Sequence, residues 1–241
     1  MGSAAEIFNR GELLLGEENV RRIADARVII FGVGGVGSWC AESLVRSGVR
    51  NLTMVDGDRV CVSNINRQLM ANTTTVGEIK VDALKQHLLK INPEANIDAR
   101  FELFNAATAD SFDLASYDYI IDAIDSLKDK ALLIEMATAT KARFYSSMGA
   151  ALKLDPTRIK VAEFWKVVGC PLARALRQRF KKEKRFPKKK FQCVYSDELL
   201  ENKGSHPGEE RINGSLQHIT AIFGLTIAGL LLRDITLRNY N

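Results

Sequence analysis

The chain has 241 residues, of which 46% are hydrophobic and 26% charged, so it is long enough to bury the core of one α/β domain, with or without a small appendage. None of its four cysteines forms a CxxC pair, which argues against a zinc ribbon or a CxxC redox site. The net charge of +5 is uneven, because residues 174–190 carry +9 and the remainder carries −4. No secretory signal opens the sequence, so we expect a cytoplasmic protein with reduced thiols.

Strands and helices alternate along the first 150 residues. Apolar residues at helical spacing predict a helical N-terminal arm over 6–25. The pattern then predicts strands at 27–31, 51–56, 96–103, 117–124 and 143–149, and helices at 35–47, 77–91 and 127–141. Such alternation is typical of a Rossmann-like, doubly wound, mostly parallel α/β sheet, in which ligands bind at the carboxyl ends of the strands.

The pattern becomes less regular after residue 150. We expect strands at 158–164 and 192–196 on either side of the basic segment, and a polar, mobile loop at 201–214. The apolar run 219–232 has 14 residues, whereas a membrane-spanning helix needs about 20. This run therefore predicts a buried C-terminal helix and no membrane partner, with a membrane anchor as the alternative.

A glycine-rich turn lies between the first strand and the following helix. Glycines here allow a tight turn and let the backbone approach a phosphate, whose charge the helix N-terminus stabilises. The turn contains Gly32, Gly34, Gly35 and Gly37. Asp56 ends the next strand, where a carboxylate accepts hydrogen bonds from ribose hydroxyls. These features alone fit an NAD site, and the glycines alone also fit a structural turn.

Polar residues that follow Asp56 favour a triphosphate over NAD. A dehydrogenase has no evident need for the group Asn64, Asn66, Arg67 and Gln68. The Arg67 guanidinium can bind phosphate oxygens through two donors at once. Lys80, in the first turn of the next predicted helix, could reach the same phosphates.

Two carboxylates end the fourth predicted strand, in "IIDAIDS". Asp122 and Asp125 stand where a carboxylate can hold a magnesium ion whose other ligands are water and phosphate. The alternative for Asp125 is a helix N-cap.

Several segments together resemble the ThiF/MoeB/HesA superfamily, the adenylating fold of the ubiquitin-activating enzymes. The resemblance covers roughly residues 6–150 and rests on "GVGGVGS", "DGD", "SNINRQ", "VGEIKVDALK" with a following "INP", and "IDAIDS". It implies nucleotide contacts from Gly34, Gly35, Gly37, Asp56, Asp58, Asn64, Asn66, Gln68 and Asp122.

The same resemblance implies catalytic roles for four residues. Arg67 and Lys80 would act on the phosphates of ATP. Asp125 would be the magnesium-linked carboxylate that adenylation needs. Asn9-Arg10 resembles an N-terminal pair whose arginine reaches into the partner subunit's site, so Arg10 would act in trans across a homodimer.

The absence of CxxC pairs departs from the superfamily's zinc-holding activators of sulfur carriers. Instead, "IDAIDSLKDKALLI", "DPTRIKVAEF" and "CVYSDE" resemble the tRNA threonylcarbamoyladenosine dehydratases. That resemblance implies ATP-dependent cyclisation of threonylcarbamoyladenosine in tRNA through a carboxyl-adenylate, with ATP and magnesium and without zinc. Cys193 lies in the last of these matches, as either a buried structural cysteine or a reactive thiol.

We therefore expect one adenylating domain over residues 1–241, with an ATP-binding core at 6–150 and a C-terminal substrate-binding extension at 151–241. The basic segment 174–190 would bind tRNA phosphates, although a charged run can also be a solvated tail. Sulfur-transfer proteins are expected partners. The alternatives are an adenylyltransferase acting on a ubiquitin-like sulfur carrier, an NAD-binding oxidoreductase, and a non-enzymatic nucleotide sensor.

Overall fold

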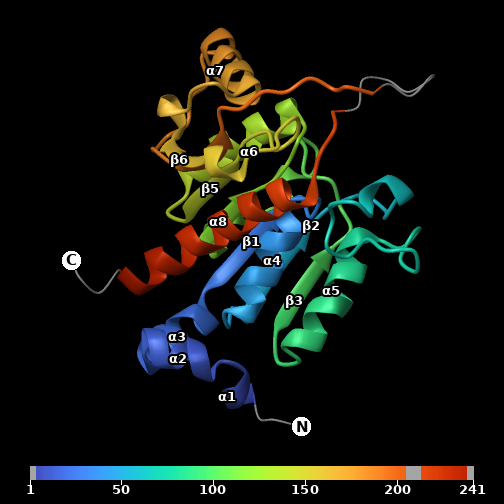
Figure 1. The fold of residues 1–241 in the computed structure, drawn as a ribbon. Helices are drawn as coiled ribbons and strands as arrows, with labels where there is room; N and C mark the ends of the chain where they lie inside the picture. Colours follow the sequence, from blue (N-terminus) through green and yellow to red (C-terminus); the bar gives the residue numbers. More distant parts are fainter. Residues whose placement is uncertain (1–3, 205–212, 238–241) are drawn as a thin grey trace.

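The computed structural model describes residues 4–204 and 213–237 and contains one seven-stranded sheet of order β3-β2-β1-β4-β5-β7-β6 (Figure 1). Its strands are β1 (Arg27–Phe31), β2 (Asn51–Val55), β3 (Asn96–Arg100), β4 (Tyr119–Asp122), β5 (Arg143–Ser147), β6 (Ile159–Glu163) and β7 (Gln192–Ser196). All neighbouring pairs are parallel except β6 with β7. The predicted doubly wound, mostly parallel α/β fold is confirmed.

The register brings the carboxyl ends of four central strands to one edge of the sheet. Phe31 pairs with Val55 on one side and with Asp122 on the other. Asp122 in turn pairs with Ser146. The chain order reverses between β1 and β4, and at such a switch point the loops diverge and leave a crevice for a ligand.

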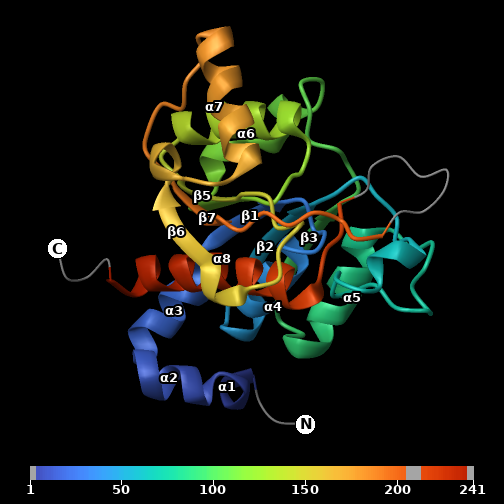
Figure 2. The same ribbon diagram turned by 45° about the horizontal axis from the view of Figure 1, so that its top comes forward.

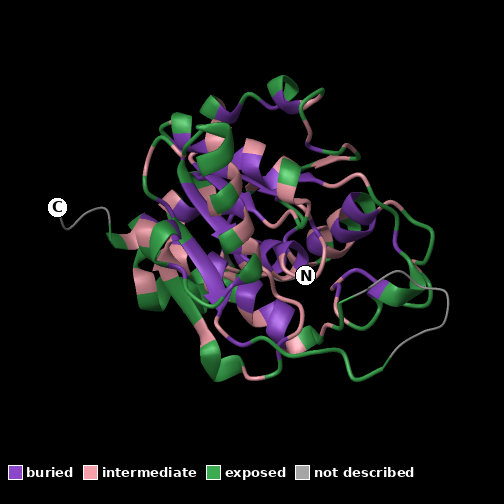
Figure 3. Ribbon diagram, turned by 90° about the horizontal axis from the view of Figure 1, so that it is seen from above, coloured by how far each residue is buried: buried purple, intermediate pink, exposed green. Residues whose placement is uncertain are grey.

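Helices cover both faces of the sheet (Figure 2). One face carries α3 (Glu17–Asp25), α4 (Gly37–Arg46), α5 (Lys80–Ile91) and α8 (Gln217–Leu237), and the other carries α6 (Leu127–Ala139) and α7 (Pro171–Glu183). Short 3-10 turns lie at Val62–Asn64, Ala109–Phe112, Leu114–Ser116, Pro156–Arg158 and Phe164–Lys166. Burial is concentrated in the strands and in the inward faces of the helices (Figure 3). In β1, Ile30 belongs to one core and Ile29 to the other, as the two-residue repeat of a strand requires.

The N-terminal arm consists of α1 (Ala4–Ile7), α2 (Asn9–Leu15) and α3, and it lies at the amino-terminal end of the strands (Figure 1). Ile23 of α3 is fully buried. By contrast, Leu13 and Leu14 of α2 are 85% and 82% exposed. The arm is therefore anchored by α3, while α2 presents apolar side chains outward.

Helix α8 packs against α4 across one face of the sheet. A Cβ on Gly224 would lie 2.4 Å from the Val36 carbonyl oxygen, so glycine permits this close approach. By length and composition α8 could cross a membrane, but half of its most apolar stretch is buried inside the protein. The expected buried C-terminal helix is present.

Much of the basic segment, for which the sequence predicted no secondary structure, is helical. Residues Pro171–Glu183 form α7, which buries Ala173, Leu176 and Phe180 against the core. Since β6 and β7 flank α7 along the chain and extend the sheet beyond β5, the region after residue 150 is continuous with the first five strands. Of the predicted mobile loop 201–214, residues 205–212 lie outside the described residues.

Candidate active site

A cleft of about 610 Å³ opens at the carboxyl ends of the central strands. Its walls come from the loops that follow the five strands β1 to β5, together with the start of α7 and the segment that enters α8. The predicted residues that line it are Gly34, Gly35, Asp56, Asp58, Arg67, Gln68, Lys80 and Asp125.

The glycine turn is shaped by steric contacts. Gly32 has a φ of +85°, and a Cβ there would lie 2.7 Å from the Ala123 carbonyl oxygen. A Cβ on Gly37 would lie 1.8 Å from the Gly32 carbonyl oxygen, so only glycine fits at the first position of α4. Gly34 and Gly35 face the cleft, whereas Gly37 does not line it. The structure gives Gly37 a steric role in closing the turn, and its nucleotide contact stays a prediction.

Asp56 lies at the carboxyl end of β2 and is partly buried. Its carboxylate accepts hydrogen bonds from the backbone N–H of Val33 at 2.8 Å and of Asp58 at 2.9 Å. Burial raises the pKa of Asp56, although Lys80 and the two N–H donors act in the opposite direction. The carboxylate is therefore oriented by backbone groups, which leaves it fixed at the cleft wall.

Lys80 is the first residue of α5, and its side chain is only 7% exposed. Its Nζ donates to Asp58 Oδ2 at 2.7 Å, while the Asp58 side chain is 62% exposed. The ammonium group is thus held in the cleft by a counter-ion at the solvent edge. Phosphate oxygens entering from that edge would meet a positive charge that is already in place.

Arg67 and Gln68 line the cleft from the loop between β2 and α5. Arg67 Nη1 donates to the Ser63 carbonyl oxygen at 2.8 Å and to Asn66 Oδ1 at 2.9 Å. Gln68 is 7% exposed, and its Oε1 has no hydrogen-bond partner among the described residues. A buried amide oxygen without a donor is unfavourable, so this atom is a position where a ligand donor would be stabilising.

Asn64 and Asn66 do not line the cleft, in contrast to the sequence prediction. Asn64 Oδ1 accepts from the Cys61 backbone N–H at 3.1 Å and so folds the loop on itself. Asn66 Nδ2 donates to the Ser215 carbonyl oxygen at 2.9 Å, which ties the loop to the segment before α8. Both asparagines shape the loop that carries Arg67, and their amide groups are used in doing so.

Asp122 was expected to contact the nucleotide, and the structure corrects this. The side chain is fully buried and pairs with Lys130 Nζ at 2.8 Å, with a further hydrogen bond from Ser146 Oγ at 2.6 Å. Burial raises the pKa of Asp122, while Lys130 acts to lower it. The Asp122 carboxylate thus faces the core, where its partners are Lys130 and Ser146, and it does not line the cleft.

The Asp122–Lys130 pair also holds the backbone beside Asp125. The Ile124 N–H donates to Asp122 Oδ1 at 3.1 Å, and the Ile124 carbonyl accepts from Lys130 Nζ at 2.9 Å. On the other side, Ser126 is the N-cap of α6 and accepts from the Asp129 N–H. Asp125 thus stands between two anchored residues, and it is not the N-cap.

Asp125 is exposed on the cleft wall, and its carboxylate makes no hydrogen bond or ion pair with any described residue. Asp129 also lines the cleft, from the first turn of α6. No group of three or more His, Cys, Asp or Glu side chains in the described ranges could hold a metal unaided. Magnesium takes one or two carboxylates together with phosphate and water, so these two carboxylates fit an ion that arrives with a nucleotide.

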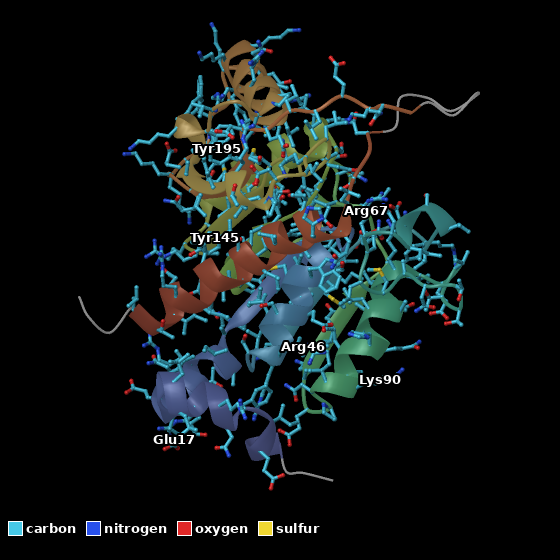
Figure 4. All side chains as sticks on the ribbon, in the orientation of Figure 1. Glu17, Arg46, Arg67, Lys90, Tyr145 and Tyr195 are labelled. Carbon is cyan, nitrogen blue, oxygen red and sulfur yellow. The ribbon has the colours of Figure 1, made fainter. Side chains whose placement is uncertain are left out.

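Arg10 is not brought to the cleft of its own chain. It lies on α2 in the N-terminal arm, at the amino-terminal end of the strands. Figure 4 shows the arm residue Glu17 at the lower left of the molecule and the cleft residue Arg67 on the right, away from the arm. An action of Arg10 on the nucleotide therefore requires a second copy, as the prediction states.

Sequence reasoning missed several cleft residues. They are Glu102, Asp129, Ser147, Asn213, Ser215 and Thr220. Asp129 could have been found from "DSLKD", because Ser126 and Asp129 have the spacing of an N-cap and its partner. Asn213 and Ser215 precede α8 and are close to the nucleotide turn only through tertiary folding, so no local pattern reveals them.

Cys193 lies in β7 and is fully buried. Burial raises the pKa of its thiol well above the ordinary value. A neutral, solvent-inaccessible thiol is a poor nucleophile, so this environment favours the structural of the two predicted roles.

The glycine turn, the carboxylate after β2 and the cations of the next segment define a nucleotide-binding α/β protein. Residues 8–240 match the ThiF family, and the chain belongs to that family. The Bacillus subtilis tRNA threonylcarbamoyladenosine dehydratase is 40% identical over 191 residues, which cover 79% of this chain and 74% of that protein.

The same comparison extends to solved structures. Escherichia coli tRNA N6-threonylcarbamoyladenosine dehydratase, TcdA, has a TM-score of 0.89 in complex with AMP and 0.87 in complex with ATP. It is 32% identical in sequence, and the match covers 98% of this chain and 96% of that chain. Escherichia coli molybdopterin-synthase adenylyltransferase is 33% identical over 62% of this chain and 58% of that protein.

Proposed function

We propose that this protein catalyses the ATP-dependent dehydration of threonylcarbamoyladenosine in tRNA, through a carboxyl-adenylate. One observation carries the proposal: Asp56, Arg67, Lys80 and Asp125 all line a single cleft at the switch point of the sheet. The relatives that match most of the chain carry the name of this activity. The match to the Escherichia coli dehydratase structure covers 98% of this chain, whereas the match to the molybdopterin-synthase adenylyltransferase covers 62%.

The chemistry requires a carboxylate to become an electrophile. An oxygen of the nucleoside carboxylate attacks the α-phosphorus of ATP, and the bond to pyrophosphate breaks with its electron pair leaving on pyrophosphate. A nitrogen or oxygen of the same side group then attacks the carbonyl carbon, loses its proton and displaces AMP. The nucleoside loses one water, and ring closure is favoured because both reacting groups belong to one molecule.

The residues of the cleft have separate tasks in this scheme. Asp56 accepts hydrogen bonds from the ribose, and the backbone of Gly34 and Gly35 lets the phosphates approach α4. Arg67 and Lys80 stabilise the negative charge that develops between the α-phosphorus and the leaving pyrophosphate. Asp125 and Asp129 would hold a magnesium ion, which supplies further charge neutralisation on the phosphates.

A homodimer would complete the site. Leu13 and Leu14 are exposed on the helix that carries Arg10, and an outward apolar face fits a contact between two copies. Arg10 of one copy would then reach the phosphates bound by the other. A cytoplasmic location, where modified tRNA and ATP are both present, and a sulfur-transfer partner belong to the same proposal.

The deciding experiment incubates the protein with ATP, magnesium and tRNA that bears threonylcarbamoyladenosine, followed by mass analysis of the nucleosides. We expect the modified nucleoside to lose one water, and only when ATP is present. Unchanged nucleoside mass, with AMP formed only after a ubiquitin-like carrier is added, would instead establish a sulfur-carrier adenylyltransferase.

A further inference from the structure

The surface beyond the cleft contains two exposed aromatic rings in contact. Of the three exposed Trp or Phe side chains in the described ranges, Trp165 is 41%, Phe186 is 45% and Phe101 is 48% exposed. The ring centroids of Trp165 and Phe186 are 6.3 Å apart, with the planes tilted by 40°. Trp165 precedes α7 and Phe186 follows it, so the contact joins the segments on either side of that helix.

Buried aromatic rings and hydrogen bonds of Arg177 hold the Trp165–Phe186 pair in place. Phe164 contacts Trp165 edge to face at 5.2 Å and stacks on Phe191 at 5.1 Å. Arg177 Nη1 donates to the carbonyl oxygens of Phe164 and Val167, which fixes the turn that carries Trp165. Exposed rings held by a packed aromatic layer lose little conformational entropy when a planar ligand stacks on them.

The surroundings of the pair are strongly basic. Residues 160–190 contain twelve Lys/Arg and two Glu. Five of these cations are used within the fold: Lys160 with Asp197, Arg177 with two backbone carbonyls, Arg179 with Glu183, Arg185 with Glu135, and Lys189 with the carbonyls that follow α6. The exposed cations of the basic segment that pair with no described residue are Arg174, Lys181, Lys182, Lys184, Lys188 and Lys190.

We propose that Trp165 and Phe186 stack on an unpaired base of a bound RNA, while the free lysines around them hold its phosphates. Aromatic rings interleaved with cations are the recurring solution for single-stranded nucleic acid, because every base has a π-face and every nucleotide a phosphate. An apolar protein partner does not explain the six unpaired cations. The proposal rests on the proposed function, in which the substrate is an RNA.

The position of the pair defines which base it contacts. Leu172 in the first turn of α7 lines the cleft, whereas neither Trp165 nor Phe186 does. The reacting nucleoside in the cleft is therefore a different nucleotide from the stacked one. The RNA must reach both places at once, which makes the surface selective for an extended loop or stem-loop over a free nucleoside.

The test is RNA binding to the full chain without ATP, using a synthetic RNA hairpin with an unpaired loop and a fully paired RNA of equal length. Trp165→Ala and Phe186→Ala should each weaken hairpin binding about tenfold, with no change in the salt dependence. Trp165→Phe should retain most of the affinity, because a ring remains. The matched control is Phe101→Ala, an exposed ring outside this surface, which should bind as the parent does.

Substitution of the lysines should change RNA binding in a different way from substitution of the aromatic rings. Lys181→Gln combined with Lys182→Gln should weaken the hairpin and the paired RNA alike, and should reduce the slope of log K against log salt by about two. Hairpin affinity that is equal in Trp165→Ala, Phe186→Ala and the parent would overturn the stacking proposal. So would a change of oligomeric state in these variants, because the rings would then lie between two copies.

Failure of this inference is distinguishable from failure of the proposed function. Dehydration of the modified tRNA with unaltered hairpin binding in the aromatic variants would remove only the stacking surface. If the aromatic variants lose hairpin affinity but the parent protein does not dehydrate the nucleoside, the stacking surface stands and the proposed function fails. The protein would then be an RNA-binding protein with another activity.

Discussion

Lys130→Met is predicted to destabilise the protein severely, because it leaves the Asp122 carboxylate buried without its counter-ion. Both side chains are fully buried, and their charged atoms are 2.8 Å apart. Removing one partner of such a pair costs about 3–5 kcal/mol. For a chain of this size, about 2–4 °C of melting temperature is lost per kcal/mol, so the melting temperature should fall by about 6–20 °C.

The assay is urea unfolding at equilibrium, with thermal unfolding as a second probe. Lys128→Met is the matched control, since Lys128 is exposed in the first turn of the same helix and should change stability by less than about 0.5 kcal/mol. The unpaired Asp122 takes up a proton more readily when folded than when unfolded. The destabilisation by Lys130→Met should therefore grow as the pH rises.

A double variant separates stability from site geometry. Asp122→Asn combined with Lys130→Met removes the uncompensated charge and keeps an acceptor for the Ile124 N–H, so part of the stability should return. The Ile124 carbonyl still lacks its Lys130 donor, so the backbone beside Asp125 is less constrained and AMP formation should stay low. A loss below about 1 kcal/mol in Lys130→Met, or full activity in the double variant, would refute this reasoning.

Three further outcomes are expected. Gly37→Ala should abolish ATP binding in equilibrium dialysis, because its Cβ would lie 1.8 Å from the Gly32 carbonyl oxygen; normal binding would disprove the steric role. Burial raises the pKa of Asp56. The KM for ATP should therefore increase as the pH falls through that raised pKa and the carboxylate is protonated. If the KM of Asp56→Asn varies with pH in the same way, Asp56 is not the group that titrates. Arg10→Ala and Asp125→Asn should each be inactive, but mixing equal amounts should restore about a quarter of the AMP formation if the sites are shared across a dimer; no recovery after subunit exchange would exclude action in trans.

The sequence was sufficient to predict the parallel sheet, because each strand has its own apolar run and each crossover has its own helical pattern. It was insufficient for α7, whose five basic residues conceal a buried face of only Ala173, Leu176 and Phe180. The helix forms because those three positions are spaced on one side and pack against the core. A charge count does not reveal such a narrow apolar face.

The cleft residues, too, could be predicted from the sequence only where a local pattern marks them. Asp56 and Asp125 were predicted to lie at one site because the carboxyl ends of parallel strands meet, and both line the cleft. Asp122 was misassigned because a strand's final residue faces either the core or the ligand, and only the Lys130 contact decides which. Thr220 was missed because α8 reaches Gly35 through tertiary packing from the far end of the chain.

The central claim is that this cleft activates a carboxylate by adenylation, and oxygen labelling tests it most directly. Modified tRNA labelled with ¹⁸O in the threonyl carboxylate would be incubated with the protein, ATP and magnesium, and the nucleotides analysed by mass. The account predicts one labelled oxygen in AMP, because the displaced AMP retains the oxygen that attacked the α-phosphorus. Label in inorganic phosphate together with ADP, or AMP free of label, would contradict it.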